Sequence, residues 1–333
     1  MSPYQPNLVH FRTPTYKRPE ALRRALESMI AQTVTTWVCD VFDDDPSEAG
    51  RHVVAELNDP RIHYTANKPQ LFASRNIDHC FTADNPHGAE YFCVVEDDNF
   101  LMPSFCEANI ALTKREGVEI VLRNQLIEHA SGTAAASVGT IGVLDDLFTE
   151  GRFDADEFRL AMLAGIGVSN GGLFWSVRAR SQLEIQYECT ATLQEYLRTY
   201  SIVEPIYVSM EPLAIWAENG EQTTRNAELS AGYLRRELDL KRAVQALRQM
   251  VWNQSSVQQR AAFMTNPRFA APVDVRATHV GKALIAEVLE GHVSPADKLR
   301  LTARGMLIRT LGRLTPEFDR FVASRQAGLM QRA

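Results

Sequence analysis

An uninterrupted apolar run that ends in three carboxylates most constrains how this chain can fold. Tyr91-Phe92-Cys93-Val94-Val95 precedes Glu96-Asp97-Asp98. Five consecutive apolar side chains predict a strand buried on both faces, because a half-buried strand alternates apolar and polar residues. Adjacent carboxylates repel one another, which is tolerable where a hard cation bridges them or where water reaches them. The segment therefore predicts either a ligand-binding edge of a sheet or an acidic turn before the next helix.

Strands and helices alternate on both sides of this run. Alternation at this spacing predicts an α/β fold, with a mostly parallel sheet, helices on both faces and right-handed crossovers. The carboxyl ends of successive parallel strands then meet at one edge of the sheet. Predicted strands at residues 8–12, 37–42, 61–65, 91–95 and 118–122 alternate with predicted helices that begin near residues 19, 48, 73 and 103.

The later part of the chain is less regular. Residues 128–165 break the alternation, and Ile166–Trp175 is a glycine-punctuated segment that leads into an apolar strand. Its glycines permit positive φ or close approach of a ligand to the backbone, and a β-hairpin turn is an equally good interpretation. A helix over residues 192–200 and a strand at 206–208 follow. From about residue 227 we predict helices at 229–251, 281–289 and 295–311.

Charge divides the 333 residues into two unequal parts. Residues 226–333 carry 17 Lys and Arg against 9 Asp and Glu, whereas residues 1–225 carry 18 against 32. The two parts therefore face different partners or face each other. In residues 295–311, basic and apolar side chains interleave. This predicts either a peripheral contact with anionic lipid or a helix packed on its own domain with a solvated basic face.

Cysteine usage and the chain start indicate a cytoplasmic protein, at most peripheral at the inner face of a membrane. The five cysteines are odd in number and form no CxxC pair, so neither a disulfide framework nor a cysteine zinc site is expected. The first residues lack a signal-peptide pattern, and no apolar run approaches the roughly 20 residues of a membrane span. No GxGxxG follows the first strand, which argues against a dinucleotide dehydrogenase.

Four motifs in order resemble those of the family 2 glycosyltransferases of GT-A fold. They are the loop Pro14–Pro19, the acidic loop Asp43–Asp45, the segment Ala73–Asn76 and the strand that ends in Glu96-Asp97-Asp98. The resemblance covers about residues 7–225. It implies a GT-A domain at 1–226, with a nucleotide-sugar half at about 7–125 and an acceptor half at about 126–226, followed by a helical region at 227–333.

The resemblance also implies which residues hold the donor. Asp44 would accept a hydrogen bond from the base, although Asp44-Asp45-Pro46-Ser47 has proline where the family has glycine. Arg75 would approach the nucleotide, or else pair with a carboxylate at the same edge. The residues that would border the base are Pro14, Thr15 and Tyr16.

Glu96-Asp97-Asp98 takes the place of the family's Asp-x-Asp motif. The resemblance implies that Asp98 is the direct ligand of Mg²⁺ or Mn²⁺, while Glu96 and Asp97 contact the nucleotide. Departure of a nucleoside diphosphate leaves negative charge on phosphate, which a divalent cation stabilises as a Lewis acid. Glu96 departs from the aspartate that is usual at the first position.

The catalytic base is expected near the end of the acceptor half. The family has a Glu-Asp pair ahead of a helix, and Glu188-Cys189 stands there with cysteine where the aspartate is expected. Glu188 is the candidate base and Glu184 the alternative, while Glu188 could equally be an exposed helix-start residue favoured by the helix dipole. Arg225 would belong to a loop that folds over the diphosphate.

The acceptor would lie beside the glycine-rich turn. The candidate residues are Asn170, Gly171, Gly172 and Trp175, although the tryptophan could also be a core residue. These expectations describe a metal-dependent inverting glycosyltransferase that moves a sugar from a nucleotide sugar, expected to be a UDP-sugar, to a hydroxyl or amine. The acceptor would be a saccharide, a lipid-linked molecule or a small molecule.

Two rival functions remain open at this point. Glu96 and Cys189 also fit a catalytically weak protein that binds nucleotide sugars or assists assembly. A nucleotidyltransferase would share the sheet and the acidic edge, but it expects a glycine-rich loop after the first strand, and Thr13–Pro19 contains no glycine. We expect no nucleic-acid partner, and homo-oligomers are compatible with the sequence.

Overall fold

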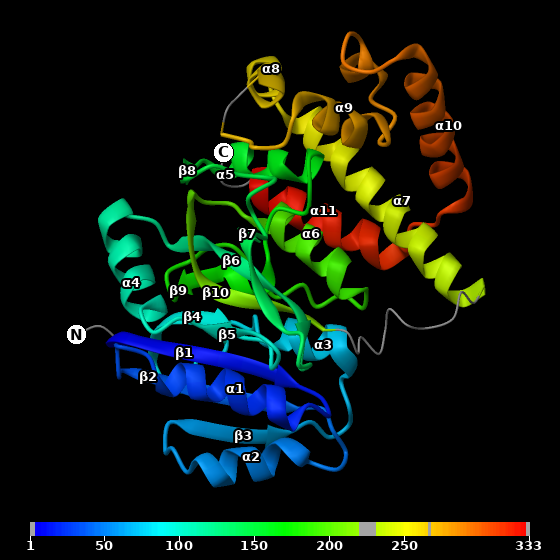
Figure 1. The fold of residues 1–333 in the computed structure, drawn as a ribbon. Coiled ribbons are helices and arrows are strands. Elements are labelled where there is room, and N and C mark those ends of the chain that lie inside the picture. Colours follow the sequence, from blue (N-terminus) through cyan, green and yellow to red (C-terminus); the bar gives the residue numbers. More distant parts are fainter. Residues whose placement is uncertain (1–3, 220–230, 266–267, 331–333) are drawn as a thin grey trace.

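The structure is a computed structural model that describes residues 4–219, 231–265 and 268–330 (Figure 1). Arg225 lies outside the described residues. A ten-stranded sheet forms the centre of the molecule, in the order β3-β2-β1-β4-β9-β6-β10-β5, with β7 paired to β6 and β8 paired to β10. The strands are β1 (Gln5–Thr15), β2 (Trp37–Asp43), β3 (Ile62–Ala66), β4 (Ala89–Val94), β5 (Phe100–Leu101), β6 (Ile120–Ser131), β7 (Ser137–Gly142), β8 (Gly151–Phe153), β9 (Leu173–Ser176) and β10 (Ile206–Asn219).

The α/β fold predicted from the sequence is confirmed. Strand β1 pairs in parallel with β2 and β4, β2 with β3, and β6 with β10. The remaining strands run the other way, and β9 lies antiparallel between β4 and β6. The helices are α1 (Pro19–Ile30), α2 (Ala49–Leu57), α3 (Phe72–His79), α4 (Phe105–Glu116), α5 (Ala155–Arg159), α6 (Ala191–Ser201), α7 (Ala231–Gln254), α8 (Val257–Thr265), α9 (Val273–Gly281), α10 (Pro295–Leu311) and α11 (Pro316–Met330).

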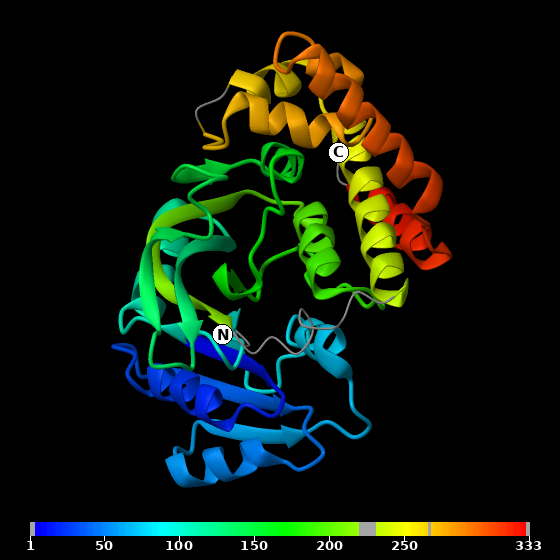
Figure 2. The ribbon, with the colours of Figure 1, turned by 45° about the vertical axis from the view of Figure 1, so that its right-hand side comes forward.

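Each face of the sheet has its own apolar core, because side chains alternate along the strands. On β1, Val9 and Phe11 pack into one core with Leu22 and Leu26 of α1. Leu8 belongs to the other core, which extends under α6 and the C-terminal helices. Figure 2 shows α1 and α2 at one end of the molecule and the C-terminal helices at the other.

The C-terminal helices differ from the prediction, because helices α8, α9 and α11 were not expected. A helix over residues 281–289 was expected, but α9 ends at Gly281 and only the short 3₁₀ turn η3 (Ala286–Leu289) follows. Apolar spacing alone could not exclude a helix here, although Gly281 and Leu284, whose φ is +62°, interrupt it. Helices α7 and α10 lie close to their predicted ranges.

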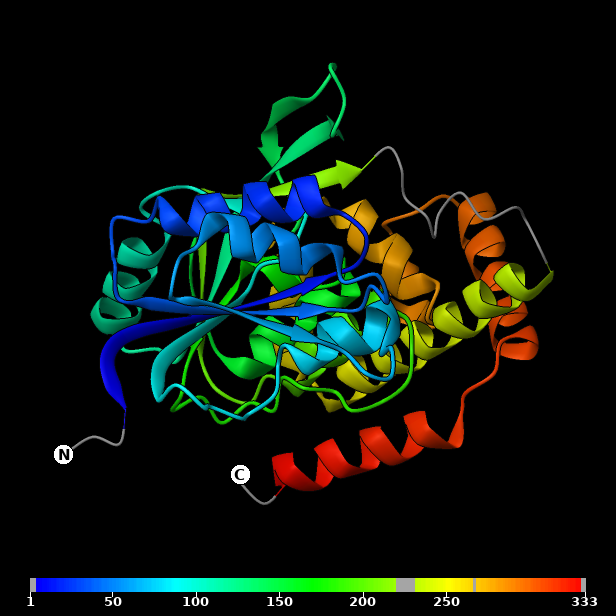
Figure 3. The ribbon, with the colours of Figure 1, turned by 90° about the horizontal axis from the view of Figure 1, so that it is seen from below.

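Two further features complete the architecture. The hairpin of β7 and the end of β6 projects from the body of the molecule (Figure 3). Among the described residues, no helix combines the length and the apolar character needed to cross a bilayer.

Candidate functional site

The three carboxylates of residues 96–98 follow the carboxyl end of β4, beside the end of β1. The Asp97 Oδ2 atom accepts a hydrogen bond from the Thr15 hydroxyl at 2.8 Å and from the Tyr16 backbone N–H at 3.3 Å. Asp97 therefore fixes the loop after β1. The fold brings together two segments that the sequence had singled out separately.

Arg18 bridges two of these carboxylates. Its Nη2 atom lies 2.9 Å from Asp97 Oδ1, and its Nη1 atom forms a short ion pair with Asp98 Oδ2. The Asp97 side chain is almost fully buried, whereas the Arg18 side chain is 45% exposed. Burial raises the pKa of Asp97 to about 7 despite the opposing effect of Arg18. Nothing in the sequence singled out Arg18 within its loop, because its role depends on the approach of β4.

Glu195 of α6 completes the acidic group, and the sequence analysis missed it. Burial, followed by the charges of Asp98 and Glu195, raises the pKa of Glu96 to about 8. Burial likewise raises the pKa of Glu195 to about 7, against the lowering effects of the Asn170 N–H and Arg198. The Asn170 N–H donates to Glu195 Oε1 at 3.4 Å. No local sequence pattern marked Glu195, because Glu96 and Asn170 come from distant segments.

Asp44 organises the loop that leads to α3. Its carboxylate accepts hydrogen bonds from the backbone N–H groups of Leu71 and Phe72, both at 2.7 Å, and from Asn67 Nδ2 at 3.2 Å. Its own N–H donates to the Thr15 carbonyl at 2.9 Å. Asp44 thus lies at the same edge as Thr15, with its carboxylate already engaged by the protein.

Two aromatic residues in the segments that contact Asp44 are open to solvent. Tyr16 is 41% exposed and Phe72 is 64% exposed. Phe72 has a φ of +62°, a strained conformation for an aromatic residue, and Asp44 holds its N–H. Tyr16 was expected from the sequence and Phe72 was not, because no spacing rule predicts a positive φ at a phenylalanine.

Two other predicted donor residues lie on the same edge in different settings. Arg75 is exposed on α3, where its Nε atom donates to the Leu71 carbonyl at 3.0 Å. Pro14 is buried in β1 opposite Phe42 of β2. The structure records no contact from either residue to the carboxylates of residues 96–98 within the described ranges.

The turn Asn170–Gly172 (η2) lies against the sheet beside two amide side chains. A Cβ atom on Gly171 would lie 2.9 Å from Gln125 Nε2 and 3.4 Å from Asn99 Nδ2. Both amide nitrogens are buried without a hydrogen-bond partner in the described part of the chain. Their oxygens are engaged, since Asn99 Oδ1 accepts from Ala217 N and Gln125 Oε1 accepts from the Ser169 hydroxyl. Two N–H donors are therefore available beside Gly171.

Asn170 and Gly172 have structural partners, and Trp175 is a core residue. Asn170 Oδ1 accepts from Arg198 Nη1 at 2.7 Å, and a Cβ on Gly172 would lie 2.6 Å from the Arg123 carbonyl. Trp175 is 7% exposed and stacks on Phe81 and Phe92, with ring centroids 5.4 and 5.8 Å away. The expectation that this ring lines the acceptor site is corrected, because the ring packs inside the core.

The segment expected to supply the base is held by Asp78, outside the acidic group. Asp78 accepts from the N–H groups of Ile185 and Gln186 at 2.9 and 2.7 Å and pairs with the buried Arg198 at 2.6 Å. Glu188 is exposed, and Glu184 is partly exposed with its carboxylate accepting from Gln186 Nε2 at 3.0 Å.

Cys189 is not chemically suited to serve as a base. Burial raises the pKa of its thiol to about 12, so the thiol stays protonated near neutral pH. A protonated thiol cannot accept the proton of an acceptor hydroxyl.

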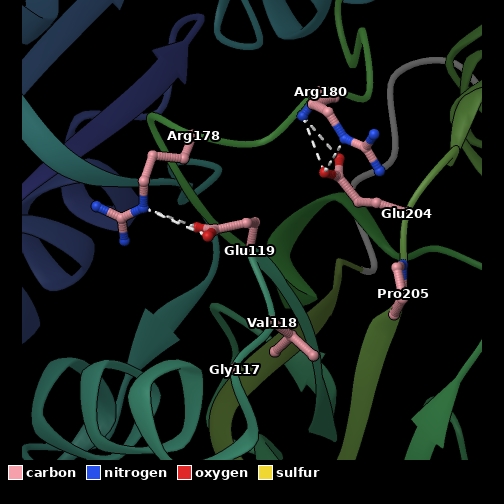
Figure 4. Close-up of a pocket in the computed structure, with 7 residues that line it drawn as sticks. All are labelled: Gly117, Val118, Glu119, Arg178, Arg180, Glu204 and Pro205. Carbon is pink, nitrogen blue, oxygen red and sulfur yellow. Dashed lines mark hydrogen bonds and ion pairs between the residues drawn. The ribbon is translucent and has the colours of Figure 1, made fainter.

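A separate cavity of about 250 Å³ lies away from these carboxylates, at the start of β6 (Figure 4). Its charged side chains pair with one another. Arg178 donates to Glu119, and Arg180 donates through its N–H and side chain to Glu204. Since these charges are mutually satisfied, the cavity offers little to a charged ligand.

Comparison with known proteins supports the family expected from the four motifs. Residues 12–140 match the model of glycosyl transferase family 2. No curated protein sequence matches the chain.

Solved structures of S. aureus TarS share the fold. The complex of TarS residues 1–349 with UDP-GlcNAc superposes with a TM-score of 0.60 at 10% identity, covering 96% of this chain and 92% of that one. The UDP complex gives a TM-score of 0.55 at 10% identity, with 96% and 91% covered. A structure of a longer TarS chain gives a TM-score of 0.52 at 10% identity, and the match spans 90% of this chain and 54% of that chain.

The segment matched by the family model, residues 12–140, contains the loop after β1, Asp44, Arg75 and the carboxylates of residues 96–98. The strand order around them is that of an α/β sheet whose parallel strands end at this edge. Residues 12–140 therefore match the glycosyl transferase family 2 model, and the chain as a whole shares the fold of the TarS structures.

Proposed function

We propose that the chain transfers a sugar from a UDP-sugar to a hydroxyl or amine, with inversion and with the help of Mn²⁺ or Mg²⁺. The observation that carries this proposal is the convergence of Glu96, Asp97, Asp98 and Glu195 beside the loop after β1. The structurally similar TarS crystals contain UDP-GlcNAc and UDP, which supports a uridine nucleotide. The acceptor would be a saccharide, a lipid-linked molecule or a small molecule.

The donor set suits a hard divalent cation. Asp97 and Asp98 present carboxylate oxygens, the ligands that Mg²⁺ and Mn²⁺ prefer. The Arg18 guanidinium bridges one oxygen of each, so this position already attracts positive charge. Asp98 would hold the ion, while Asp97 keeps the loop after β1 in place. When bound, the ion supplies Lewis-acid stabilisation of the departing diphosphate.

The nucleotide would lie along the ends of β1, β2 and β3. Tyr16 and Phe72 offer exposed aromatic side chains in the segments that contact Asp44, and stacking on such rings is worth about 1–3 kcal/mol per base. Pro14 and Thr15 shape the edge beneath the base. Asp44 would act mainly by fixing the backbone of Leu71 and Phe72, although one of its oxygens can accept a further hydrogen bond. Arg75 is free to approach the phosphates from α3.

Glu195 is the better candidate for the base that takes the acceptor proton. It adjoins Glu96 in the acidic group, and its raised pKa of about 7 suits proton transfer near neutral pH. Glu188, by contrast, is exposed in the loop before α6. The free amide nitrogens of Asn99 and Gln125 beside Gly171 would donate hydrogen bonds to sugar hydroxyls.

Calorimetry with UDP, GDP and dTDP tests the proposal. We expect UDP to bind most tightly, and only in the presence of Mn²⁺ should binding reach full strength. Asp98→Asn should remove the metal-dependent part of UDP binding, whereas the matched control Asp319→Asn, on α11, should leave it unchanged. Failure of all three nucleotides to bind with metal present would refute a nucleotide-sugar transferase. Binding without any transfer from UDP-sugars would instead favour a catalytically weak nucleotide-sugar-binding protein.

A further inference from the structure

Three side chains with metal-ligand chemistry converge on the sheet away from the carboxylates of residues 96–98. His10 Nε2 lies 2.8 Å from Asp40 Oδ2, and His87 Nε2 lies 3.1 Å from each oxygen of Asp40. The ligand atoms of the three residues all lie within 4.8 Å of one another. His10 precedes Thr15 by five residues on β1, which separates the two sites by roughly 16 Å at about 3.3 Å per residue.

The fold assembles this cluster from three distant segments. His10 lies on β1 and Asp40 on β2, and these strands pair in parallel with His10 opposite Val38. His87 comes from the loop that enters β4 at Ala89. Along β1, His10 follows Leu8 on the face opposite Val9 and Phe11, so a polar ring stands where an apolar residue would be expected. His10 is 1% exposed, and such a buried imidazole requires a specific partner.

We propose that His10, Asp40 and His87 form a zinc site with three protein ligands and one open position. Two imidazole nitrogens and one carboxylate oxygen are a donor set that Zn²⁺ favours over Mg²⁺ or Ca²⁺. A tetrahedral ion with bonds of about 2.0–2.1 Å needs donor atoms about 3.3 Å apart. The two His-to-Asp40 separations of 2.8 and 3.1 Å lie within a few tenths of an ångström of this value, and all three ligand atoms lie within 4.8 Å of one another.

The surroundings give the ion an entry path. A cavity of about 500 Å³ is lined by His87, His63, Trp37 and Arg61, among others. The His63 ring stacks on His87 with centroids 5.1 Å apart and planes 14° apart, which holds the His87 ring in one orientation. Water or a small solute in this cavity could fill the fourth position, as at zinc sites with three protein ligands.

Zinc at this site would tie β1, β2 and the start of β4 together. Strand β4 carries Glu96, Asp97 and Asp98 after its other end, so the ion would brace the donor site from a distance. Because a preformed site does not exist in the unfolded chain, zinc bound only by the folded protein raises its stability.

Metal competition on the full chain tests the assignment. The protein is first dialysed against a chelator and then titrated with Zn²⁺ in the presence of a chromogenic zinc indicator. We expect one tight zinc per wild-type chain and a rise in Tm with zinc. Asp40→Asn and His87→Asn should each weaken zinc binding by about a hundredfold or more, since even outer-shell changes cost about 10–100-fold.

Two control variants distinguish zinc binding at this site from zinc binding at other histidine or carboxylate side chains. His52→Gln changes an exposed histidine on α2, and Asp98→Asn changes the carboxylate assigned to Mn²⁺ or Mg²⁺, so both should retain tight zinc. Circular dichroism and thermal unfolding confirm that the variants fold. The proposal is overturned if wild-type protein takes no zinc from the indicator, or if Asp40→Asn and His87→Asn bind it as wild type does.

Substitution of cobalt gives a second readout that does not depend on variants. Co²⁺ in a tetrahedral nitrogen and oxygen site shows intense visible d–d bands, whereas octahedral Co²⁺ absorbs weakly. We expect the intense bands in wild type and their displacement by stoichiometric Zn²⁺. A weak spectrum would mean that the three side chains are only a hydrogen-bonded triad.

Discussion

At the scale of single residues, Glu195 and Glu188 are the competing candidates for the base that takes the acceptor proton. We expect Glu195→Gln to lower kcat by about a hundred- to ten-thousand-fold while UDP affinity changes little, because only the proton transfer is lost. Glu188→Gln should leave turnover near wild type, since that side chain is exposed. Steady-state kinetics on both variants, with calorimetry for UDP, makes the comparison. Full activity of Glu195→Gln would show that another carboxylate is the base.

The pKa of Glu195 gives the pH dependence of the same step. A base must be ionised to accept a proton, so kcat/KM should rise with pH through about 7 and level off above it. The Glu195→Gln variant should lose this rise. Control variants at exposed carboxylates should keep it.

Glu96 couples the site to the stability of the fold. Its pKa of about 8 lies above the ordinary glutamate value, so the folded chain binds this proton more tightly than the unfolded chain does. The contribution of the Glu96 proton to the free energy of unfolding is therefore fully present below about pH 4.5, and it is lost as the pH rises through about 8. We expect Glu96→Gln to raise Tm at pH 8 by more than it does at pH 5, as measured by calorimetry without metal. An equal effect at both pH values would contradict the coupling.

Gln125 tests whether the free amide donors beside Gly171 recognise a sugar. Gln125→Met keeps a side chain of similar size but removes the N–H donor, so KM for the acceptor should rise about tenfold while UDP affinity stays constant. Gly171→Ala should act in the same direction, because its Cβ would cover both amide nitrogens. Unchanged KM in both variants would show that the donors serve packing alone.

The residue-scale outcome shows what spacing can and cannot reveal. Residues 96–98 directly follow a buried strand, and parallel strands end at the same edge of a sheet. Their nearness to the loop after β1 therefore followed from topology. Glu195 and Arg18 could not be found this way, because their partners come from segments 99 and 79 residues away in sequence. Trp175 has an aromatic ring of the kind that stacks on sugars, but whether such a ring faces the core or a cleft depends on packing.

At the scale of elements, α10 combines a buried face with an exposed apolar face. Leu301, Gly305 and Ile308 are buried, whereas Leu299, Met306 and Leu307 on the other side are 73%, 50% and 54% exposed. At 100° per residue, Arg300 and Arg304 flank this exposed face on one side and Lys298 and Arg309 on the other. Apolar side chains between basic ones match an anionic lipid surface.

Vesicle sedimentation tests whether α10 contacts lipid. Wild-type protein should bind vesicles containing phosphatidylserine more than neutral ones, and salt should weaken this binding. The double variant Leu299→Asn, Leu307→Asn should bind about tenfold less. Val257→Asn removes an equally exposed apolar residue from α8 and should bind as wild type. Equal sedimentation with both vesicle types would mean that this helix face has another partner.

The strands differ in how clearly the sequence pattern predicts them. Strands β1 to β4 and β6 were predictable because helices separate them, and most of these strands are buried on both faces, although in β3 only Ile62 is buried. Strands β5, β7 and β8 are two to six residues long and pair only as edges, so their sequences carry no distinct period. Strand β9 was expected after the glycine turn, but its antiparallel place between β4 and β6 depends on the path of residues 132–172.

At the scale of the whole molecule, the C-terminal helices share a core with residues 126–219. Leu247 and Trp252 of α7 belong to the same apolar cluster as Leu163 and Leu197. The buried Arg248 donates from Nε to the Met162 carbonyl at 2.6 Å, which joins α7 to the short turn after α5. Although charge separates residues 1–225 from 226–333, packing unites them.

This shared core predicts that residues 1–226 do not fold stably without the C-terminal helices. Burying a large apolar side chain contributes about 1.5–3 kcal/mol, so losing the contacts of Leu247, Trp252 and Phe263 costs an amount comparable to a typical total stability of about 5–15 kcal/mol. We expect the truncated chain to aggregate, and co-expression with residues 227–333 to restore solubility. Solubility, thermal unfolding and UDP binding are the measurements. A monomeric 1–226 fragment with cooperative unfolding and wild-type UDP affinity would show instead that the C-terminal helices form a separable domain.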